Sequence, residues 1–343
     1  MTRCTIVPPY LLQRLATLDD PVFAPAAAAA RNSLLLDRPW RGIRAGESAP
    51  PTTAPSRPTA VGRRLEEPQR SIFDAHNTED LPGSPVAEPA SSTDPAVTEA
   101  HAGLGHTHDL YRYEFERASI DDNNLPLHAT VHFGQQYDNA FWDGERMVFG
   151  DGDEVVFTRM TRSLSVIGHE LAHGVTQYSA NLVYSGQSGA LNESVSDVFG
   201  ALVEQRALSQ SASEATWLIG EGIFTDQVEG SALRSLRAPG TAYDDDVLGT
   251  DPQPAHMDDF VVTATDNGGV HLNSGIPNRA FYLVAASLGG NAWERAGQIW
   301  YSTLVSGTLD PHATFADFAA ATVSAAGADS TAVTEAWKTV GVL

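Results

Sequence analysis

Val166-Ile-Gly-His-Glu-Leu-Ala-His-Gly-Val175 contains two histidines, His169 and His173, four positions apart, with Glu170 beside the first. Residues i and i+4 lie on one face of a helix, so both imidazoles can reach a single metal ion. Glu170 is rotated by about 100° from His169 around the helix axis, so it can lie beside that ion without binding it. This pattern is typical of zinc peptidases, in which the histidines bind zinc and the glutamate is the general base. Taken alone, the stretch also fits two histidines on an ordinary amphipathic helix.

A second segment, 189–200, contains a further candidate ligand for the same ion. Its apolar residues recur at roughly helical spacing, which predicts a second helix with one buried face. Glu193 on this helix would complete a set of two histidines and one glutamate and leave a fourth position for water, as a catalytic zinc needs. Asn192 and Asp197 lie on the polar side of the same helix, and Asp197 is placed to accept the outer N–H of a ligand histidine and fix its tautomer.

Four further segments match one known family: Tyr137-Asp-Asn-Ala-Phe-Trp-Asp-Gly144, Met147-Val-Phe-Gly-Asp-Gly-Asp153, Leu233-Arg-Ser235 and Asp266-Asn-Gly-Gly-Val-His-Leu-Asn-Ser-Gly275. With the two helices above, the chain resembles the thermolysin family of zinc metalloproteases over roughly residues 70 to 343. The resemblance implies an α+β fold with two lobes and zinc at the helix between them. We expect a β-rich N-terminal lobe at 70–205, which includes the zinc helices, and a mainly helical C-terminal lobe at 206–343.

The resemblance also implies a function for individual residues. Glu170 would act as base, Asp266 would orient His271, and His271 and Tyr184 would donate hydrogen bonds to the oxyanion of the tetrahedral intermediate. Asn139, Ala140 and Arg234 would bind the main chain of the substrate. The expected primed-side pocket is apolar throughout and comprises Phe157, Val166, Ile219, Ile223 and Leu233. The implied activity is that of a zinc-dependent neutral endopeptidase, broad in specificity, that cleaves before bulky hydrophobic residues.

Some of these residues keep a plainer interpretation on the sequence alone. His271 and Asp266 could form a buried structural pair. Arg234 could make a surface salt bridge. The strand that holds Ala140 could be an ordinary core strand, although that would not explain Asn139.

Residues 1–50 form a separate unit, joined by a Pro-, Ser- and Thr-rich linker at 51–69. Pro8 and Pro9 predict an extended entry to a helix that begins near Tyr10. The Pro-Pro-Tyr-Leu-Leu element resembles the short propeptide of the protealysin-like branch of the family, which implies an inhibitory propeptide whose residues Val7–Leu11 block the cleft. Cys4 could also approach the zinc as a thiolate in place of water, or be an unremarkable terminal thiol.

The linker and the first residues of the chain bear on processing and export. Arg63-Arg64 in the linker offers a site for processing, although a solvated basic pair is the commoner meaning. Residues 1–12 lack a basic segment followed by a long apolar core, so a usual secretory signal is not expected. Secretion is expected from the family resemblance, while a cytoplasmic location or an unconventional route stays open.

Composition excludes several classes of protein. The formal net charge is −22, which argues against nucleic-acid binding because that requires a basic patch. Cys4 is the sole cysteine, so no intrachain disulfide can form. No run of about 18 apolar residues is present, so no transmembrane helix is expected. We expect a monomer whose partners are peptide and protein substrates and its own propeptide.

Calcium is expected to be absent or weakly bound. Long-propeptide relatives carry a carboxylate-rich calcium site next to the zinc helix, and the matching positions here are Ser165, Thr216 and Leu218, with only Glu204 and Glu221 acidic. Calcium prefers 6–8 oxygen ligands, largely anionic, so this site should be empty. The acidic residues at Asp151, Asp153 and 244–246 could hold calcium, but solvated loop charge explains them as well.

The remaining patterns predict local structure. Alternation at 111–116 and at 129–133 predicts strands, and 103–109, with His106 and His108, predicts a glycine-rich turn. Periodic segments at 279–290, 292–306 and 314–325 predict helices.

Two other classes of function remain to be weighed. A non-catalytic zinc-binding module would have lost Glu170 or the oxyanion donors, and both are present. An aminopeptidase needs a separate site for a free amine, and the sequence contains no such motif, although an acidic cleft could serve.

Overall fold

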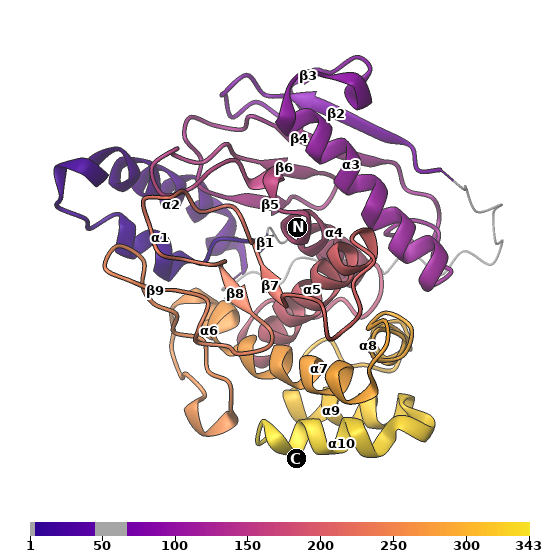
Figure 1. Ribbon diagram of the computed structural model, residues 1–343. Coiled ribbons are helices and arrows are strands. Elements are labelled where there is room, and N and C mark those ends of the chain that lie inside the picture. Colours follow the sequence, from indigo (N-terminus) through magenta and orange to yellow (C-terminus); the bar gives the residue numbers. More distant parts are fainter. Residues whose placement is uncertain (1–3, 45–66) are drawn as a thin grey trace.

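The computed structural model describes residues 4–44 and 67–343. It has two lobes with α4 (Leu164–Gln177) and α5 (Gly186–Ala207) between them, and a small helical unit at the N-terminus (Figure 1). The predicted α+β fold class is confirmed. The predicted processing pair, Arg63-Arg64, lies outside the described residues, as does nearly all of the predicted linker.

A six-stranded mixed sheet forms the N-terminal lobe. Its order is β1-β5-β6-β4-β2-β3, and β2, β4 and β6 are parallel while β5 and β6 form an antiparallel pair. The strands are β1 (Cys4–Thr5), β2 (Arg70–Asp74), β3 (Ser84–Pro85), β4 (Leu127–Val131), β5 (Ala140–Trp142) and β6 (Met147–Phe149). The outermost strand beside β5 comes from the N-terminal unit, so the cleft edge of the lobe is already paired.

Residues 103–114 are helical and 115–116 follow the helix without forming a strand, so the predicted turn and the predicted strand there are both wrong. α3 (Pro95–Asp109) runs through the glycines and continues into a π-helical turn at Leu110–Glu114. Gly103 is needed for packing, because a Cβ at that position would lie 2.4 Å from Cδ1 of Ile167. Tyr111 and Phe115 alternate like strand residues, but they are also four positions apart, and as helix neighbours they pack on Phe199.

The two helices predicted to carry the metal ligands are present as α4 and α5, and they pack closely. A Cβ on Gly200 would lie 2.5 Å from the carbonyl oxygen of Ser165, so only glycine lets the two backbones approach this far. Both helices are buried along most of their length. This close packing turns His169 and His173 of α4 toward Glu193 of α5.

The C-terminal lobe is mainly helical, as predicted. Its helices are α6 (Asp266–Asn273), α7 (Gly275–Leu288), α8 (Ala296–Leu304), α9 (Phe315–Ala325) and α10 (Ser330–Thr339), and two short hairpins precede them, β7 (Leu218–Ile219) with β8 (Arg234–Ser235) and β9 (Asp244–Asp245) with β10 (Gly249–Thr250). A capping box between Thr314 and Asp317 starts α9. The predicted helix at 292–306 begins only at Ala296, because the chain before it forms turns.

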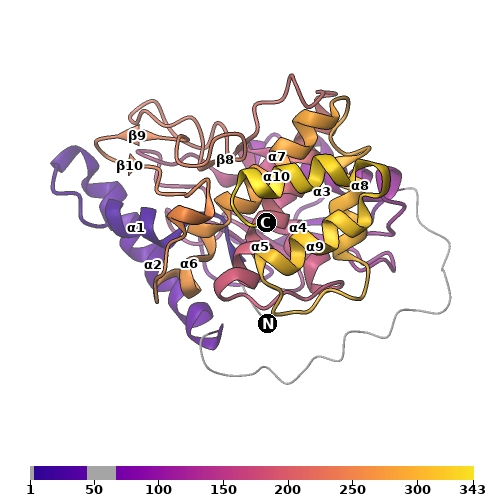
Figure 2. The ribbon, with the colours of Figure 1, turned by 90° about the horizontal axis from the view of Figure 1, so that it is seen from below.

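The N-terminal unit comprises β1, α1 (Pro9–Leu15) and α2 (Ala24–Arg44). Pro9 occupies the first turn of α1, as predicted from the proline pair. Figures 1 and 2 place α1 and α2 at the end of the molecule where β9 lies, away from α8. Among the described residues, no helix is both long and apolar enough to span a bilayer.

Candidate active site

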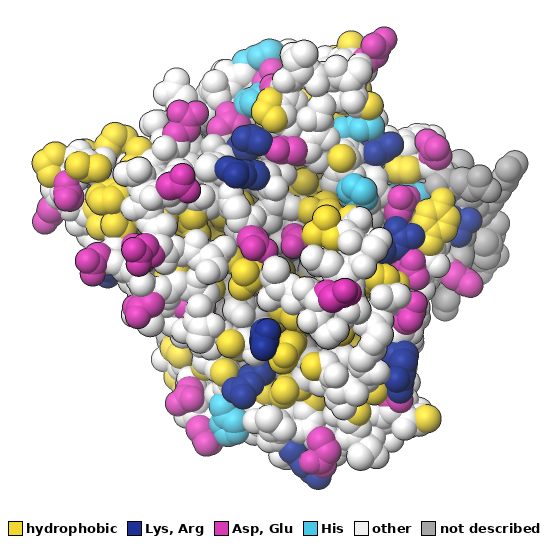
Figure 3. Space-filling model, viewed as in Figure 1, with side chains coloured by type: hydrophobic (Ala, Val, Ile, Leu, Met, Phe, Trp, Pro, Cys, Tyr) yellow, Lys and Arg dark blue, Asp and Glu magenta, His cyan; other side chains and the backbone are white. Residues whose placement is uncertain are grey.

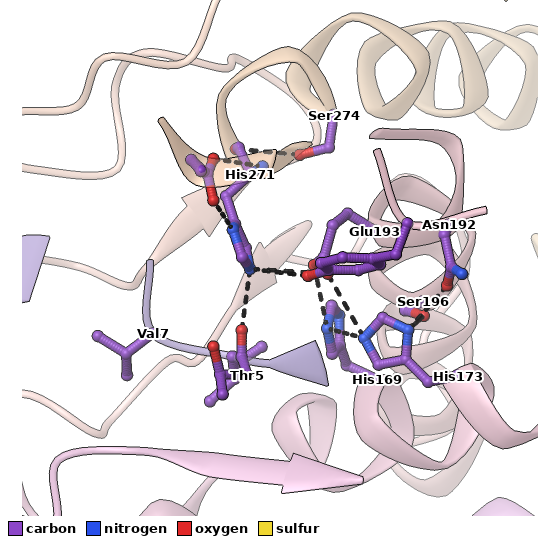
Figure 4. Close-up of polar contacts among 12 residues, drawn as sticks. Thr5, Val7, His169, His173, Asn192, Glu193, Ser196, His271 and Ser274 are labelled. Atoms are coloured by element: carbon purple, nitrogen blue, oxygen red, sulfur yellow. Dashed lines mark hydrogen bonds and ion pairs between the residues drawn. The ribbon is translucent and has the colours of Figure 1, made fainter. Parts of the chain in front are cut away.

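His169, His173 and Glu193 converge in the buried space between α4 and α5 (Figure 4). The Nε2 atoms of the two histidines lie 3.1 Å apart. Oε2 of Glu193 lies 3.4 Å from Nε2 of His169, and Oε1 lies 3.7 Å from Nε2 of His173. The side chains of the three residues are at most 2% exposed.

The outer ring nitrogens of both histidines face acceptors. Nδ1 of His169 lies 2.8 Å from Oδ1 of Asp197, and Nδ1 of His173 lies 2.8 Å from Oδ1 of Asn192. The amide nitrogen of Asn192 donates to the carbonyl of Leu182, which fixes its oxygen toward His173. Since both acceptors require a proton on Nδ1, each Nε2 presents a lone pair.

These contacts fit a bound zinc ion. Two lone pairs that face each other at 3.1 Å cannot share a hydrogen bond, and a cation between them resolves the contact. Within the described part of the chain, Oε2 of Glu193 is buried without a hydrogen-bond partner, which is the situation of a carboxylate oxygen that binds a metal. Two imidazoles and a carboxylate form a ligand set typical of catalytic zinc.

The surrounding charges act on the pKa values of the carboxyl groups. Burial tends to raise the pKa of Glu193, but His271, His173 and His169 outweigh it and lower that pKa well below its ordinary value. Burial also opposes ionisation of Asp197, yet Arg234 and His169 lower its pKa to about 2. Both groups are therefore carboxylates at neutral pH.

Glu170 follows His169 on α4 and is fully buried. Its Oε2 accepts a hydrogen bond from the backbone N–H of Trp142 at 3.0 Å, and its Oε1 has no hydrogen-bond partner among the described residues. Burial raises the pKa of Glu170, and the charge of Glu193 raises it further. A raised pKa and a free oxygen suit a group that takes up and returns a proton.

His271, Asp266 and Tyr184 form a connected group beside Glu193, and Nε2 of His271 lies 3.6 Å from Oε1 of Glu193 (Figure 4). Asp266 contacts Nδ1 of His271 at 2.6 Å and accepts from its backbone N–H at 2.9 Å. Asn267, Gly268 and Gly269 all have positive φ, which lets Asp266 fold back onto the histidine. Nε2 of His271 lies 3.3 Å from the hydroxyl of Tyr184, which itself donates to Glu193.

Arg234 is fully buried, so the interpretation as a surface salt bridge is wrong. Its Nε and Nη2 donate to the two carboxylate oxygens of Asp197 at 2.9 and 2.8 Å. Asn278 donates to the same carboxylate at 2.8 Å. No local sequence pattern indicates Asn278, and none assigns a contact to Ser196, a residue on the polar side of α5 whose hydroxyl lies 3.0 Å from Nδ1 of His173.

The N-terminal strand occupies the groups expected to bind substrate. The N–H of Ile6 donates to the carbonyl of Ala140 at 3.1 Å, and the carbonyl of Ile6 accepts from Nη1 of Arg234 at 2.9 Å. The side chain of Asn139 bonds to both the N–H of Val7, at 2.9 Å, and its carbonyl, at 3.3 Å. These main-chain contacts fall on Thr5–Val7, earlier in the chain than the expected Val7–Leu11.

The other residues named from the sequence are also near the cleft. Ile6 and Val7 share one buried apolar cluster with the five expected pocket residues, Phe157, Val166, Ile219, Ile223 and Leu233. Pro8 and Pro9 are buried and Tyr10 is half-buried. The ligand atoms of Cys4, His173 and Glu193 all lie within 4.8 Å of one another, so a thiolate at Cys4 could reach a shared ion.

The positions expected to lack calcium form internal hydrogen bonds. The backbone N–H of Ser165 donates to Oε2 of Glu204 at 3.1 Å, and its hydroxyl accepts from the N–H of Gly220 at 3.2 Å. Burial raises the pKa of Glu204.

Two histidines and a glutamate, beside a second buried carboxylate, are the arrangement of hydrolytic rather than structural zinc sites, so the fold and the site define a metallohydrolase. Comparison with known proteins names the group. Residues 64–177 match the family model described as "Thermolysin metallopeptidase, catalytic domain", and residues 180–342 match "Thermolysin metallopeptidase, alpha-helical domain". The chain belongs to the thermolysin metallopeptidase family and is a zinc-dependent metalloendopeptidase.

Individual relatives cover nearly the whole chain. An "Extracellular metalloprotease" of Pectobacterium carotovorum subsp. carotovorum is 46% identical over 349 residues, with 99% of this chain and 96% of the relative covered. "Protease PrtS" of a Photorhabdus strain is 50% identical over 80% of this chain and 76% of its own length. The solved structure described as the precursor of protealysin, a metalloproteinase from Serratia proteamaculans, is 47% identical with a TM-score of 0.88, over 99% of this chain and 100% of that one.

Proposed function

We propose that the chain is the autoinhibited precursor of a neutral endopeptidase that cleaves before bulky hydrophobic residues. One observation carries the proposal. Cys4 and Thr5 pair with β5 as an added strand, and Asn139, Ala140 and Arg234, the groups expected to hold substrate, hold the main chain of Ile6 and Val7 instead. Substrate therefore cannot enter while β1 is in place, and residues 1–50 act as an inhibitory propeptide.

We assign the metal to His169, His173 and Glu193, as one zinc ion. Zinc lowers the pKa of water and polarises a carbonyl oxygen. Glu170 takes a proton from the attacking water and returns it to the leaving nitrogen, for which its buried position and raised pKa are suited.

His271, oriented by Asp266, and Tyr184 donate hydrogen bonds to the oxyanion as it forms. Arg234 and Asn139 hold the substrate main chain in line with this centre. Asn192 and Asp197 keep both ligand histidines in the tautomer that presents Nε2.

The specificity follows from the apolar pocket. A pocket lined by Phe157, Val166, Ile219, Ile223 and Leu233 offers no polar partner, so it favours Leu, Phe or Ile and distinguishes them by only about 1–3 kcal/mol per methylene. β1 supports cleavage inside a chain rather than at its end, because residues continue on both sides of the Thr5–Ile6 peptide bond within the site.

The remaining assignments concern setting and partners. We propose secretion, because relatives are named extracellular metalloproteases, with peptide and protein substrates as the partners of a monomer. On the face in Figure 3, Lys and Arg side chains are scattered among acidic ones, and this together with the net charge of −22 supports our proposal that the chain does not bind nucleic acid. We also propose that calcium is not required.

A full-length Ile6→Asp variant tests the proposal. A carboxylate in the apolar pocket costs several kcal/mol, so β1 should leave the cleft and hydrolysis of an N-blocked reporter peptide should rise about 10-fold or more. Val22→Asp, at a site 62% exposed in the same unit, is the matched control and should change nothing. Adding Glu170→Gln should lower the released activity by about 10³-fold. Cleavage mapped on a peptide mixture should fall before Leu, Phe or Ile, and an Ile6→Asp chain no more active than the wild type would refute autoinhibition by β1.

A further inference from the structure

We propose that the Thr5–Ile6 peptide bond is a self-cleavage site that the side chain of Cys4 protects. The N-terminal strand is then a tethered substrate bound in the productive direction, and one side chain keeps it from being cut. The inference rests on the proposed function, because it uses the same catalytic groups.

The first argument is the direction and register of the strand. The carbonyl oxygen of Thr5 accepts from Nε2 of His271 at 2.9 Å, the group assigned to the oxyanion (Figure 4). The next carbonyl along the chain, that of Ile6, accepts from Arg234 at 2.9 Å. The carbonyl of Thr5 therefore contacts the donor assigned to the scissile carbonyl, and the carbonyl of Ile6 contacts the donor assigned to the next one. This register places the Thr5–Ile6 bond at the reacting position.

The second argument is the fit of the side chains that follow this bond. Ile6 and Val7 are aliphatic and both 0% exposed, within the main apolar core of the molecule, to which the five expected pocket residues also belong. Ile6 is the residue just after the scissile bond, and it is of the bulky hydrophobic kind that the pocket favours. The N–H of Ile6, the leaving nitrogen, is held by the carbonyl of Ala140 at 3.1 Å.

The third argument explains why a well-bound bond stays intact. Cys4 is 3% exposed, and its sulfur lies with the ligand atoms of His173 and Glu193 inside one 4.8 Å cluster. A thiolate is a strong zinc ligand, so at this place it fills the position that the attacking water needs. Hydrolysis is prevented by exclusion of water, while the peptide geometry is that of a substrate.

The reaction that Cys4 prevents is simple hydrolysis. The oxygen of water bonds to the carbonyl carbon of Thr5, the bond from that carbon to the nitrogen of Ile6 breaks, and Glu170 transfers the proton to the nitrogen. The products are a fragment that ends in the carboxylate of Thr5 and a chain that begins with the amine of Ile6.

Full-length, zinc-loaded Cys4→Ala chain tests the proposal by intact mass and N-terminal sequencing. We expect a fragment that ends at Thr5 and a new N-terminus at Ile6, neither of which the wild type should give. Cys4→Ala with Glu170→Gln should stay uncut at this bond, which would show that the chain cleaves itself. Cys4→Ala with Ile6→Asp should also spare the bond, because the pocket then rejects the residue that follows it.

A second measurement does not depend on turnover. In the inactive Glu170→Gln chain, alkylation of Cys4 by iodoacetamide should be at least 10-fold slower with zinc than after zinc removal by a chelator. Equal rates would overturn the role of Cys4.

The outcomes separate this inference from the proposed function. Should the Cys4→Ala chain keep the Thr5–Ile6 bond while the Ile6→Asp chain hydrolyses a reporter peptide, the self-cleavage proposal fails and the endopeptidase stands. Cleavage of Cys4→Ala at another bond between residues 4 and 12 would also overturn the register. If neither chain hydrolyses anything, both proposals fail.

Discussion

His271 shows how one side chain can serve substrate and inhibitor alike. Its Nδ1 is fixed by Asp266 at 2.6 Å, and its Nε2 donates to the carbonyl of Thr5 at 2.9 Å. Because the donor is preorganised and buried, it should contribute about 3 kcal/mol to the stabilisation of an oxyanion in the same place.

We therefore predict that His271→Phe, made in the Ile6→Asp chain to open the cleft, lowers kcat/KM for a reporter peptide about 10²-fold. Zinc content, measured by atomic absorption, should be unchanged because His271 is not assigned as a ligand. His76→Phe is the matched control, since the side chain of His76 is 65% exposed and lies outside the site. A loss below 3-fold would remove His271 from the catalytic groups.

The site residues that the sequence indicated are those with a local signature. His169, Glu170 and His173 lie within one helical turn of each other, so their shared face can be derived from spacing alone. Asn278 carries no such signal, because it reaches Asp197 from another helix, α7, more than 80 residues further along. Its role depends on how α5 and α7 pack, and no local pattern encodes that packing.

At the scale of elements, an ion cluster joins the start of α3 to the sheet. His132, directly after β4, places Nε2 2.7 Å from Asp94 and Nδ1 2.8 Å from Asp151. Asp94 is the N-cap of α3, and Asp151 follows β6. The hydrogen bond to Asp151 raises the pKa of His132, and the hydrogen bond to Asp94 raises it further. Partial burial acts in the opposite direction, and the resulting pKa is about 9.

A pH dependence of stability follows from this shift. Since the folded pKa of about 9 exceeds the ordinary 6.5, the stabilisation is complete below about pH 6.5 and is lost as pH rises through 9. His132→Asn should therefore lower the free energy of unfolding by about 1–2 kcal/mol at pH 6, a value discounted because both carboxylates are about one-third exposed. Asparagine tolerates the positive φ of 54° at this position.

The measurement is the difference in Tm between the wild type and the variant at pH 6 and pH 10, with Glu170→Gln in both chains to prevent self-digestion. The difference should be a few degrees at pH 6 and should shrink at pH 10. His76→Asn is the control, because His76 has a similar φ of 52° and an exposed side chain. A difference that stays constant with pH would contradict the assignment to the charged imidazole.

Helices with long periodic patterns could be predicted from the sequence. The secondary-structure predictions were wrong where one segment fits both the two-residue period of a strand and the period of a helix. Residues 111–116 fit a strand by alternation and a helix by the four-residue spacing of Tyr111 and Phe115, and the packing of both rings on Phe199 decides for the helix. The glycines at 103 and 105 indicate a turn locally, but the side chain of Ile167 packs against Gly103, where a Cβ atom would collide with it, within a helix. In both places tertiary contacts override the local pattern.

At the scale of the whole molecule, hydrogen bonds within the chain join the segments next to α4 where we expect no calcium site. Ser165 binds Glu204 through its N–H and Gly220 through its hydroxyl, so the three segments that such an ion would join are already connected. The acidic hairpin at Asp244–Asp245 likewise lies beside a positively charged side chain, because Arg14 donates to the carbonyls of Asp246 and Val247. We therefore expect neither place to require calcium, which prefers 6–8 oxygen ligands.

We predict that the Tm of chelator-treated, zinc-restored Glu170→Gln chain changes by less than about 2 °C when calcium is added in the millimolar range. With a formal net charge of −22, any divalent cation reduces self-repulsion slightly, so magnesium at equal concentration is the control for screening. A specific site would instead raise the Tm with calcium and not with magnesium, since magnesium demands a smaller, octahedral set of ligands. In that case the Glu204→Gln variant would locate the ion. If calcium no longer raised the Tm of this variant, the ion would lie beside α5, and if calcium still raised it, the Asp244–Asp245 hairpin would be the next place to test.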